Sequence, residues 1–200
     1  MKKLLLIPFI TTSFIFASNI DEAKKYINQH EYTKAINLLN KVKENKKVDY
    51  LLGLAYYKRH LTYGDYKLAR LYLSKVKNKT DAHLYLANMY ENELGGKIDM
   101  KKAIKHYKIA NTKEANYKLG VIYLEGKYVL KDPKTGVKYL QRSAHQGCAK
   151  AQYLLGKLYL TGNEALNKNL TLAAKWLKEA SQNGIKESKE LWDKYKLYQY

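Results

Sequence analysis

A five-residue pattern recurs along this chain every 33 to 36 residues, and this period limits the possible folds more than any other feature. Each copy has a leucine, a neighbour that is Gly or Ala in four copies, two variable positions and a tyrosine. The leucines are Leu52, Leu86, Leu119, Leu155 and Leu191. A period of this length predicts supersecondary units that stack on their neighbours, because one unit alone cannot bury its apolar face.

The residues around these leucines have the spacing of one helix face. An alanine stands four residues before three of them, at Ala82, Ala115 and Ala151, and Val48 takes that place in the first copy. Positions i, i+4 and i+8 of an α-helix lie on the same side. We therefore expect each copy to be a helix, whose small residue beside the leucine lets a neighbouring helix come close.

A second column of small residues alternates with the first and predicts a second helix in each unit. It comprises Ala35, Ala69, Ala103, Gly136 and Ala173. Asp or Asn stands four residues earlier in most copies, at Asp65, Asp99, Asp132 and Asn169, where it is expected to cap the helix N-terminus. Glycines at Gly147 and Gly184 are expected to end second helices.

These columns resemble the Sel1-like repeats, close relatives of tetratricopeptide repeats (TPR). The segments from Ala115 to Gly147 and from Ala151 to Gly184 carry the pattern most fully. The resemblance implies an all-α fold, an α-solenoid of stacked antiparallel helix pairs wound as a right-handed superhelix. It divides the chain into a TPR-like opening pair at 18–45, Sel1-like repeats at 46–184 and a C-terminal capping helix at 185–200.

The first 17 residues are expected to form a signal peptide. Lys2 and Lys3 precede a mostly apolar stretch from Leu4 to Phe16, and Ala17 is a small residue at a plausible cleavage point. A retained N-terminal anchor is the alternative. No later segment is long and apolar enough to span a bilayer, so we expect a mature chain without a transmembrane segment, located in the periplasm or secreted.

The charge is strongly basic, with 37 Lys and Arg against 18 Asp and Glu and a net charge of +19. Only three of the basic residues are arginines, whereas phosphate recognition usually uses the arginine fork. Composition bias and solvated helix faces account for the charge more simply than a dedicated electrostatic surface does. Together with the predicted export, this argues against a nucleic-acid ligand.

The resemblance implies that the protein binds a partner along the concave face formed by the first helices. The partner is expected to be a protein or peptide, with an acidic segment as one candidate, because tyrosines and lysines recur at the outward positions. The alternative is that some of these tyrosines contact the next repeat. The candidate binding residues are Tyr50, Leu54, Tyr57, Asn88, Tyr117, Val121, Tyr153 and Lys157, and Leu160 holds a further outward position.

An enzymatic alternative comes from a cysteine-rich group of exported Sel1-like proteins to which β-lactam binding or hydrolysis has been attributed. The stretch around Cys148 is similar to that group, but this is the only cysteine in the chain. Short fragments also match the motifs of β-lactam-acting enzymes, namely Ser74-x-x-Lys77, Ser181-x-Asn183 and Lys134-Thr135-Gly136. The last of these belongs on a strand, whereas here it lies at the start of an expected helix. We therefore assign no catalytic residues.

No metal or cofactor site is expected. The five histidines are scattered without zinc-site spacing, and no glycine-rich phosphate loop follows a strand. The sequence thus predicts an exported interaction scaffold. A β-lactam- or peptidoglycan-acting hydrolase and an electrostatic binder of anionic envelope polymers are the alternatives.

Overall fold

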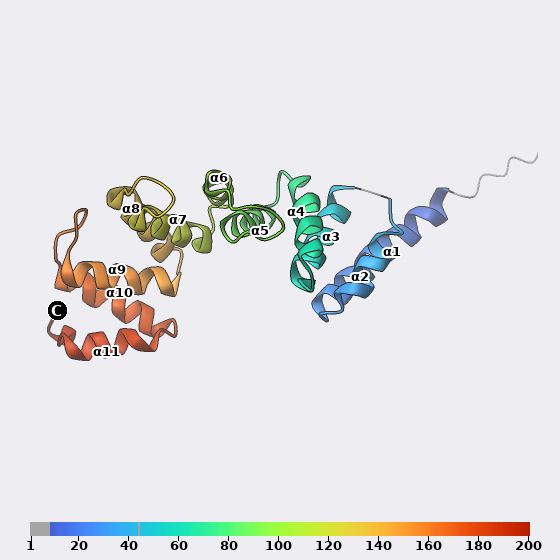
Figure 1. Cartoon of the computed structure of the whole chain (residues 1–200). Helices are drawn as coiled ribbons and strands as arrows, with labels where there is room; N and C mark the ends of the chain where they lie inside the picture. Colours follow the sequence, from blue (N-terminus) through green and yellow to red (C-terminus); the bar gives the residue numbers. More distant parts are fainter. Residues whose placement is uncertain (1–8, 44) are drawn as a thin grey trace, which may run out of the picture. The chain divides into compact units, whose positions relative to one another are not determined.

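The computed structural model describes residues 9–43 and 45–200, with side chains from residue 18 onward, and every regular element in this part is a helix (Figure 1). The elements are α1 (Phe9–Asn28), α2 (Tyr32–Leu39), α3 (Lys46–Arg59), α4 (Tyr63–Ser74), α5 (Thr80–Glu91), α6 (Met100–Ala110), α7 (Lys113–Glu125), α8 (Pro133–His145), α9 (Ala149–Thr161), α10 (Leu170–Gln182), α11 (Lys186–Lys194) and the 3-10 helix η1 (Leu197–Gln199). The predicted all-α fold is confirmed.

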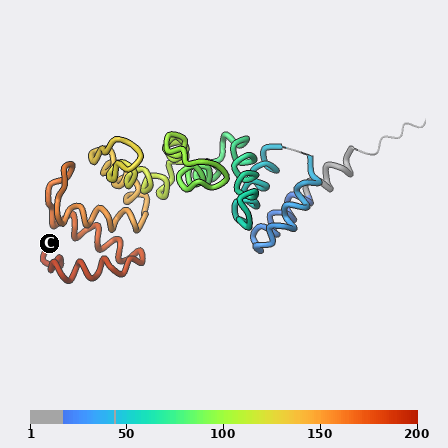
Figure 2. Tube along the Cα trace, viewed as in Figure 1, coloured from blue at the N-terminus to red at the C-terminus, as the bar shows by residue number. Residues whose placement is uncertain are grey.

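The chain divides into two compact units, Met1–Asp99 and Met100–Tyr200. In the first unit, α1 packs against α2, α3 against α4, and α5 against α4. In the second, α7 packs against α8 and α9 against α10, and α11 and η1 pack on α10. The two helices of a pair run antiparallel, as the chain trace shows for α9 with α10 (Figure 2). This is the helix-pair architecture of an α-solenoid.

The start of the predicted signal peptide, including Lys2 and Lys3, lies outside the described residues, and so do the side chains up to Ala17. Export therefore stays a prediction. Within the part of the chain that the structure describes, no helix has the length and apolar character needed to cross a membrane.

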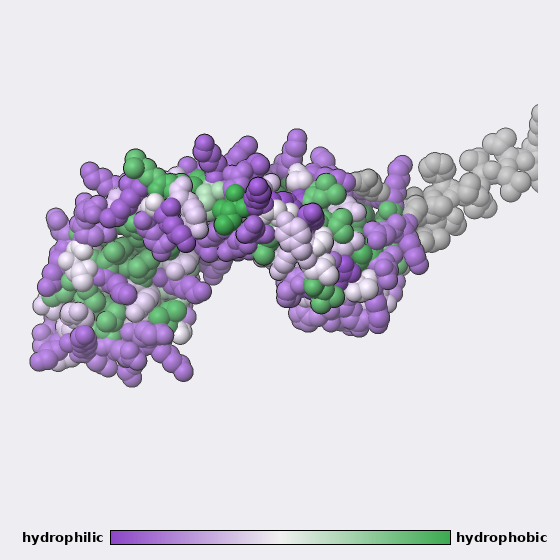
Figure 3. Space-filling view, viewed as in Figure 1, coloured by the Kyte–Doolittle hydropathy of each residue, from purple (hydrophilic) through white to green (hydrophobic). Residues whose placement is uncertain are grey.

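The leucine column and the small-residue column meet in the core of each unit. Leu52, Leu86, Leu119 and Leu155 are at most 4% exposed, and Leu73, Leu140 and Leu177 of the second helices are fully buried. Figure 3 shows hydrophilic side chains over most of the visible face of each unit. The apolar columns thus form the core, while the lysines lie mainly outside it.

The small residue next to the column leucine allows the two helices of a pair to touch. A methyl group added at Gly120 would lie 2.7 Å from two Leu140 side-chain atoms and 3.1 Å from the Gly136 carbonyl oxygen. Added methyl groups at Gly53 and Gly156 would collide in the same way with Leu73 and Leu177. Contacts under 3.0 Å are closer than carbon atoms pack in protein cores, so glycine at these sites sets the spacing between the helices of a pair.

Aromatic stacking joins the same helix pairs. Tyr56 on α3 stacks on Tyr72 on α4 with ring centroids 5.9 Å apart, and Tyr123 on α7 stacks on Tyr139 on α8 at the same distance. Both pairs combine the tyrosine of the first column with the aromatic residue of the second. Offset ring pairs at this distance contribute about 0.5–1.5 kcal/mol beyond area burial.

Two of the four predicted N-caps are correct, and the prediction for Asp65 is wrong. The side chains of Asp132 and Asn169 cap α8 and α10. Asp99 directly precedes α6. Asp65 instead lies inside α4, because Thr62 is the N-cap and its hydroxyl accepts a hydrogen bond from the Asp65 backbone N–H.

Asp65 stabilises the turn between α3 and α4 through hydrogen bonds of its side chain. Its buried carboxylate accepts hydrogen bonds from Arg59 at Nε (3.1 Å) and Nη2 and from the Leu61 backbone N–H at 3.0 Å. The hydrogen bond from Arg59, then its charge and the backbone N–H donors, lower the pKa of Asp65. The ionised carboxylate therefore stabilises the fold at neutral pH.

We expect Gly120→Ala to destabilise the protein by about 1–3 kcal/mol, since the new methyl group meets Leu140 and the α8 backbone. In an open helix the same change is stabilising by up to about 1 kcal/mol. Gly64→Ala in α4 is the matched control, because the nearest atom to its added methyl lies 3.4 Å away. Urea unfolding of both variants checks the prediction, and a neutral or stabilising Gly120→Ala would contradict it.

We expect Asp65→Asn to lower the free energy of unfolding at pH 7 by about 1.5–3 kcal/mol, the range for hydrogen bonds to charged groups. Because the pKa of Asp65 is lowered in the folded state, its contribution is present above the usual Asp pKa of about 3.9 and is lost as the pH falls toward the folded value. The difference between wild type and variant in urea unfolding should therefore shrink from pH 5 to pH 2. A difference that does not change with pH would refute the role of the charge.

Candidate functional site

Two equivalent pockets lie at the starts of first helices, one in each unit. The N-terminal pocket has a volume of about 450 Å³ and is formed by α1, the first turns of α3 and the connection between α4 and α5. The C-terminal pocket, of about 580 Å³, is formed by the start of α7 and the connections before α9 and α11. Both volumes fall in the range of about 300–1,000 Å³ that is usual for ligand sites.

The repeat register relates the two pockets residue by residue. Tyr50 and Tyr117 each stand two residues before their column leucine, and both line a pocket. Lys79 and Cys148 each occupy the N-cap of the next first helix. The same backbone position thus carries an ammonium group in the first unit and a half-buried free thiol in the second.

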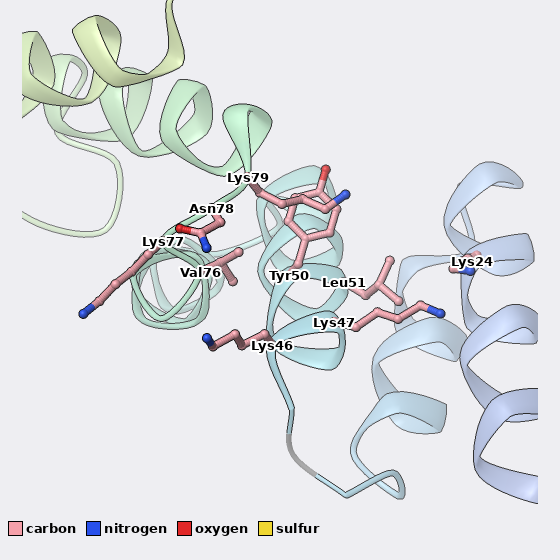
Figure 4. Close-up of a pocket in the computed structure, with 9 residues that line it drawn as sticks. All are labelled: Lys24, Lys46, Lys47, Tyr50, Leu51, Val76, Lys77, Asn78 and Lys79. Atoms are coloured by element: carbon pink, nitrogen blue, oxygen red, sulfur yellow. The ribbon is translucent and has the colours of Figure 1, made fainter. Parts of the chain in front are cut away.

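Tyr50 is the centre of the N-terminal pocket (Figure 4). The Nζ atom of Lys79 lies 4.2 Å from its ring centroid, and its hydroxyl donates to Asp81 Oδ2 at 3.3 Å. Burial, and next the charge of Asp81, raise the pKa of Tyr50 to about 12. Tyr50 therefore stays a neutral hydrogen-bonding ring at physiological pH.

Tyr117 has the corresponding place in the C-terminal pocket. It is half-buried against the core of the second unit, and burial raises its pKa. The lining contains Lys113, Lys118 and Lys150, with Glu114 as its carboxylate. This pocket is larger and carries less net positive charge than the N-terminal one.

The other predicted binding residues are not brought into either pocket. Tyr57 lies 4.6 Å from Tyr85 between ring centroids, and its hydroxyl donates to Asn88 Oδ1 at 3.0 Å. Tyr57 and Asn88 thus connect α3 to α5, which matches the alternative in which such tyrosines contact the next repeat. Leu54 packs half-buried against the core of the first unit.

In the second unit, Lys157 extends over the Tyr153 ring, with Nζ 5.5 Å from the centroid, and Val121 is half-buried on α7. Leu160, expected to face outward, is 5% exposed and belongs to the core. That expectation is wrong because α9 packs this side against its neighbours.

A column of buried polar residues holds the pocket walls in place, and it was not recognised from the sequence. Its members each stand three residues before a column leucine, and all are less than 9% exposed: Asp49, His83, Asn116, Gln152 and Ser188. Asparagine, glutamine and histidine next to an alanine column look like ordinary surface residues in a single sequence. Their recurrence in register was the available signal.

Three members of this column form an ion pair or a hydrogen bond with the C-cap residue of the partner helix. Asp49 pairs with Lys75, Asn116 Nδ2 donates to Gln146 Oε1 at 2.9 Å, and Gln152 Oε1 accepts from Asn183 Nδ2 at 2.9 Å.

The residues that follow these helix ends line the pockets, as Val76 to Lys79 do in the first unit and Gly147 to Lys150 in the second. His83 Nε2 adds a hydrogen bond to the Lys77 carbonyl at 2.9 Å. Since buried polar groups need their partners, the four members Asp49, His83, Asn116 and Gln152 fix the connections that form the walls. The Ser188 hydroxyl has no hydrogen-bond partner among the described residues and does not contribute in this way.

The fragments that match β-lactam-acting enzymes have structural roles in helices. Ser74 ends α4 and donates to the Leu71 carbonyl, and Lys134-Thr135-Gly136 forms the first turn of α8. Asn183 donates to Gln152. Among the described residues, no three His, Cys, Asp or Glu side chains are grouped to hold a metal ion.

Comparison with known proteins identifies this helix-pair architecture as one of Sel1 repeats. The model of the Sel1 repeat family matches residues 80–112, 113–148 and 149–185. The crystal structure of a Sel1 repeat protein from Oxalobacter formigenes is similar with a TM-score of 0.72 and 24% identity, over 84% of this chain and 71% of that chain.

A second crystal structure, of c5321, a protective antigen present in uropathogenic Escherichia coli strains, displays an SLR fold. It is similar with a TM-score of 0.66 and 24% identity, over 82% of this chain but only 35% of the antigen. At these identities the two structures establish the fold alone.

We expect Gln152→Ala to destabilise the protein by about 1–3 kcal/mol, because it removes the three hydrogen bonds of a buried side chain, to the Ala144 carbonyl, to Glu179 and from Asn183. Gln182→Ala on α10 is the matched control, since this glutamine is exposed. Thermal unfolding of both variants checks the prediction. Equal melting temperatures for the two would show that the polar column does not hold the helix pairs together.

Proposed function

Because the chain belongs to the Sel1 repeat family, we propose that it is an interaction scaffold, and that each unit binds a segment of another protein in its own pocket. The Sel1 repeat fold is commonly used for protein interaction. The observation that carries the proposal is the recurrence of one tyrosine-lined pocket at the same repeat position in both units, at Tyr50 and Tyr117.

The chemistry of the pockets supports a peptide ligand. A half-buried tyrosine supplies a large flat contact surface and loses little conformational freedom on binding. Both pockets lie where first helices begin, so they present lysine side chains around an apolar floor. An extended segment with one apolar side chain and polar neighbours is complementary to such a surface.

We place this scaffold outside the cytoplasm, in the periplasm or the secreted fraction. The support is the N-terminal sequence, in which two lysines precede a mostly apolar stretch that ends at Ala17. The partner is then an envelope or extracellular protein. No observation on the described residues favours the hydrolase alternative.

The test is a pull-down from envelope extract with purified, immobilised protein, analysed by mass spectrometry at low and at high salt. We expect a partner that survives high salt and is lost from the double variant Tyr50→Ala/Tyr117→Ala. Tyr128→Ala/Tyr198→Ala is the matched control, because these two tyrosines are exposed and line neither pocket.

Thermal unfolding must show that both double variants are folded. If the pocket variant unfolds, leucine replaces alanine, since leucine keeps apolar contact and removes the ring. Retention of the partner by the folded pocket variant would disprove the assignment of the site. Capture of a salt-labile mixture alone would favour an electrostatic binder of anionic polymers.

A further inference from the structure

The N-terminal pocket has an unbalanced charge. Among the residues that the structure describes, five lysines and no carboxylate line it: Lys24, Lys46, Lys47, Lys77 and Lys79. The remaining lining residues are Tyr50, Leu51, Val76 and Asn78. Such a concentration of one charge around a concave surface attracts ligands of the opposite charge.

Asp21 neutralises one lysine of this set, Lys24, and leaves the pocket with an excess of positive charge. Asp21 pairs with Lys24 at 2.7 Å, and Asp81 accepts the hydrogen bond of Tyr50. Lys46 and Lys77 are exposed and form no ion pair with another described residue. Their ammonium groups are available to a ligand.

The two helix ends at this pocket add to its positive potential. Lys46 and Lys47 are the first residues of α3, and Lys79 is the N-cap of α5. Helix N-termini carry a partial positive charge that falls off within one turn. The lysines and both helix ends thus favour the same kind of ligand.

The floor of the pocket is apolar, and this favours an acidic peptide with an apolar side chain over a phosphate polymer. The Tyr50 ring, Leu51 and Val76 form it, with the lysines around it (Figure 4). A bare phosphate polymer gains nothing from such a floor, and no arginine lines this pocket to hold phosphate in a fork. A peptide whose apolar side chain is flanked by carboxylates uses both features.

We propose that the N-terminal pocket selects an acidic peptide segment, in which an apolar side chain rests on Tyr50, Leu51 and Val76 and flanking Asp or Glu side chains pair with Lys46 and Lys77. This rests on the proposed scaffold function and names the chemistry of its partner. The C-terminal pocket lacks this selectivity, because Glu114 replaces Lys47 and Cys148 replaces Lys79 at the equivalent positions.

The probe is a fluorescein-labelled dodecapeptide with one central Phe flanked on both sides by Asp and Glu. Its matched control has Asn and Gln in place of every Asp and Glu. Fluorescence anisotropy with the purified chain measures both dissociation constants. We expect the acidic peptide to bind at least about tenfold more tightly, because each exposed ion pair contributes up to about 1 kcal/mol. Equal affinities would overturn the proposal.

The variant Lys46→Gln/Lys77→Gln localises the site, and Lys101→Gln/Lys105→Gln on α6 is its control with the same change in net charge. The control lysines are exposed and line neither pocket. We expect the first variant to weaken binding of the acidic peptide about five- to tenfold and the second to change it less than about twofold. Equal losses would assign the effect to net charge and overturn the proposal.

Inorganic polyphosphate is the competing ligand. If it displaces the peptide and binds wild type more tightly than the peptide does, the pocket is a site for anionic polymers and the proposal is wrong. If the acidic peptide shows no preference while the envelope pull-down still depends on Tyr50 and Tyr117, only the acidic selectivity fails. If the Tyr50→Ala/Tyr117→Ala variant retains the partner in the pull-down, the proposed scaffold function itself is wrong.

Discussion

The close contact between the two helices of a pair, at Gly53, Gly120 and Gly156, is the constraint on which the rest of the structure depends. At each of these glycines, a leucine of the second helix occupies the space that the Cβ atom of any other residue in the first helix would need. This spacing lets Tyr56 stack on Tyr72 and Tyr123 on Tyr139. These glycines therefore set the distance between the two helices that carry each stacked tyrosine pair.

The hydrogen bonds and the ion pair of the buried polar column hold the connections between helix pairs in place, and these connections line the pockets. The buried polar column reaches from the first helices to the ends of their partners, and the connections that follow carry Lys79 and Cys148 into the pockets. The proposed binding surface thus lies on the parts of each repeat where one helix pair is connected to the next. These connections differ in their side chains between the two pockets, while the leucine core is the same in both.

Most of the fold follows from the sequence, because the leucine, alanine and tyrosine columns keep the spacing of a helix face over many copies. The second-helix columns and two of the N-caps were also predicted correctly. Asp65 was misassigned because the Thr62 hydroxyl competes for the cap, and the Arg59 side chain that binds Asp65 comes from the preceding helix. Spacing alone carries no information on such a competition.

The candidate site was less predictable for a similar reason. Tyr50 and Tyr57 both have outward positions on α3, yet only Tyr50 lines a pocket. The difference lies in α5, where Asn88 accepts the hydroxyl of Tyr57 and Tyr85 covers its ring. A residue's availability therefore depends on the next repeat, which a pattern within one repeat does not describe.

The polar column has the same place in every repeat, but its chemistry varies: Asp49 pairs with the ammonium group of Lys75, whereas Asn116 with Gln146 and Gln152 with Asn183 are amide pairs in which Asn and Gln exchange places. The leucine and alanine contacts are nearly the same in every repeat, so these contacts alone would also allow a helix to pack against a helix of the wrong repeat during folding. A polar pair buried with the wrong mate would lose its hydrogen bonds. We infer that the mismatch between the charged pair and the amide pairs disfavours the association of a helix with the wrong partner, and so helps to keep a repetitive chain in register.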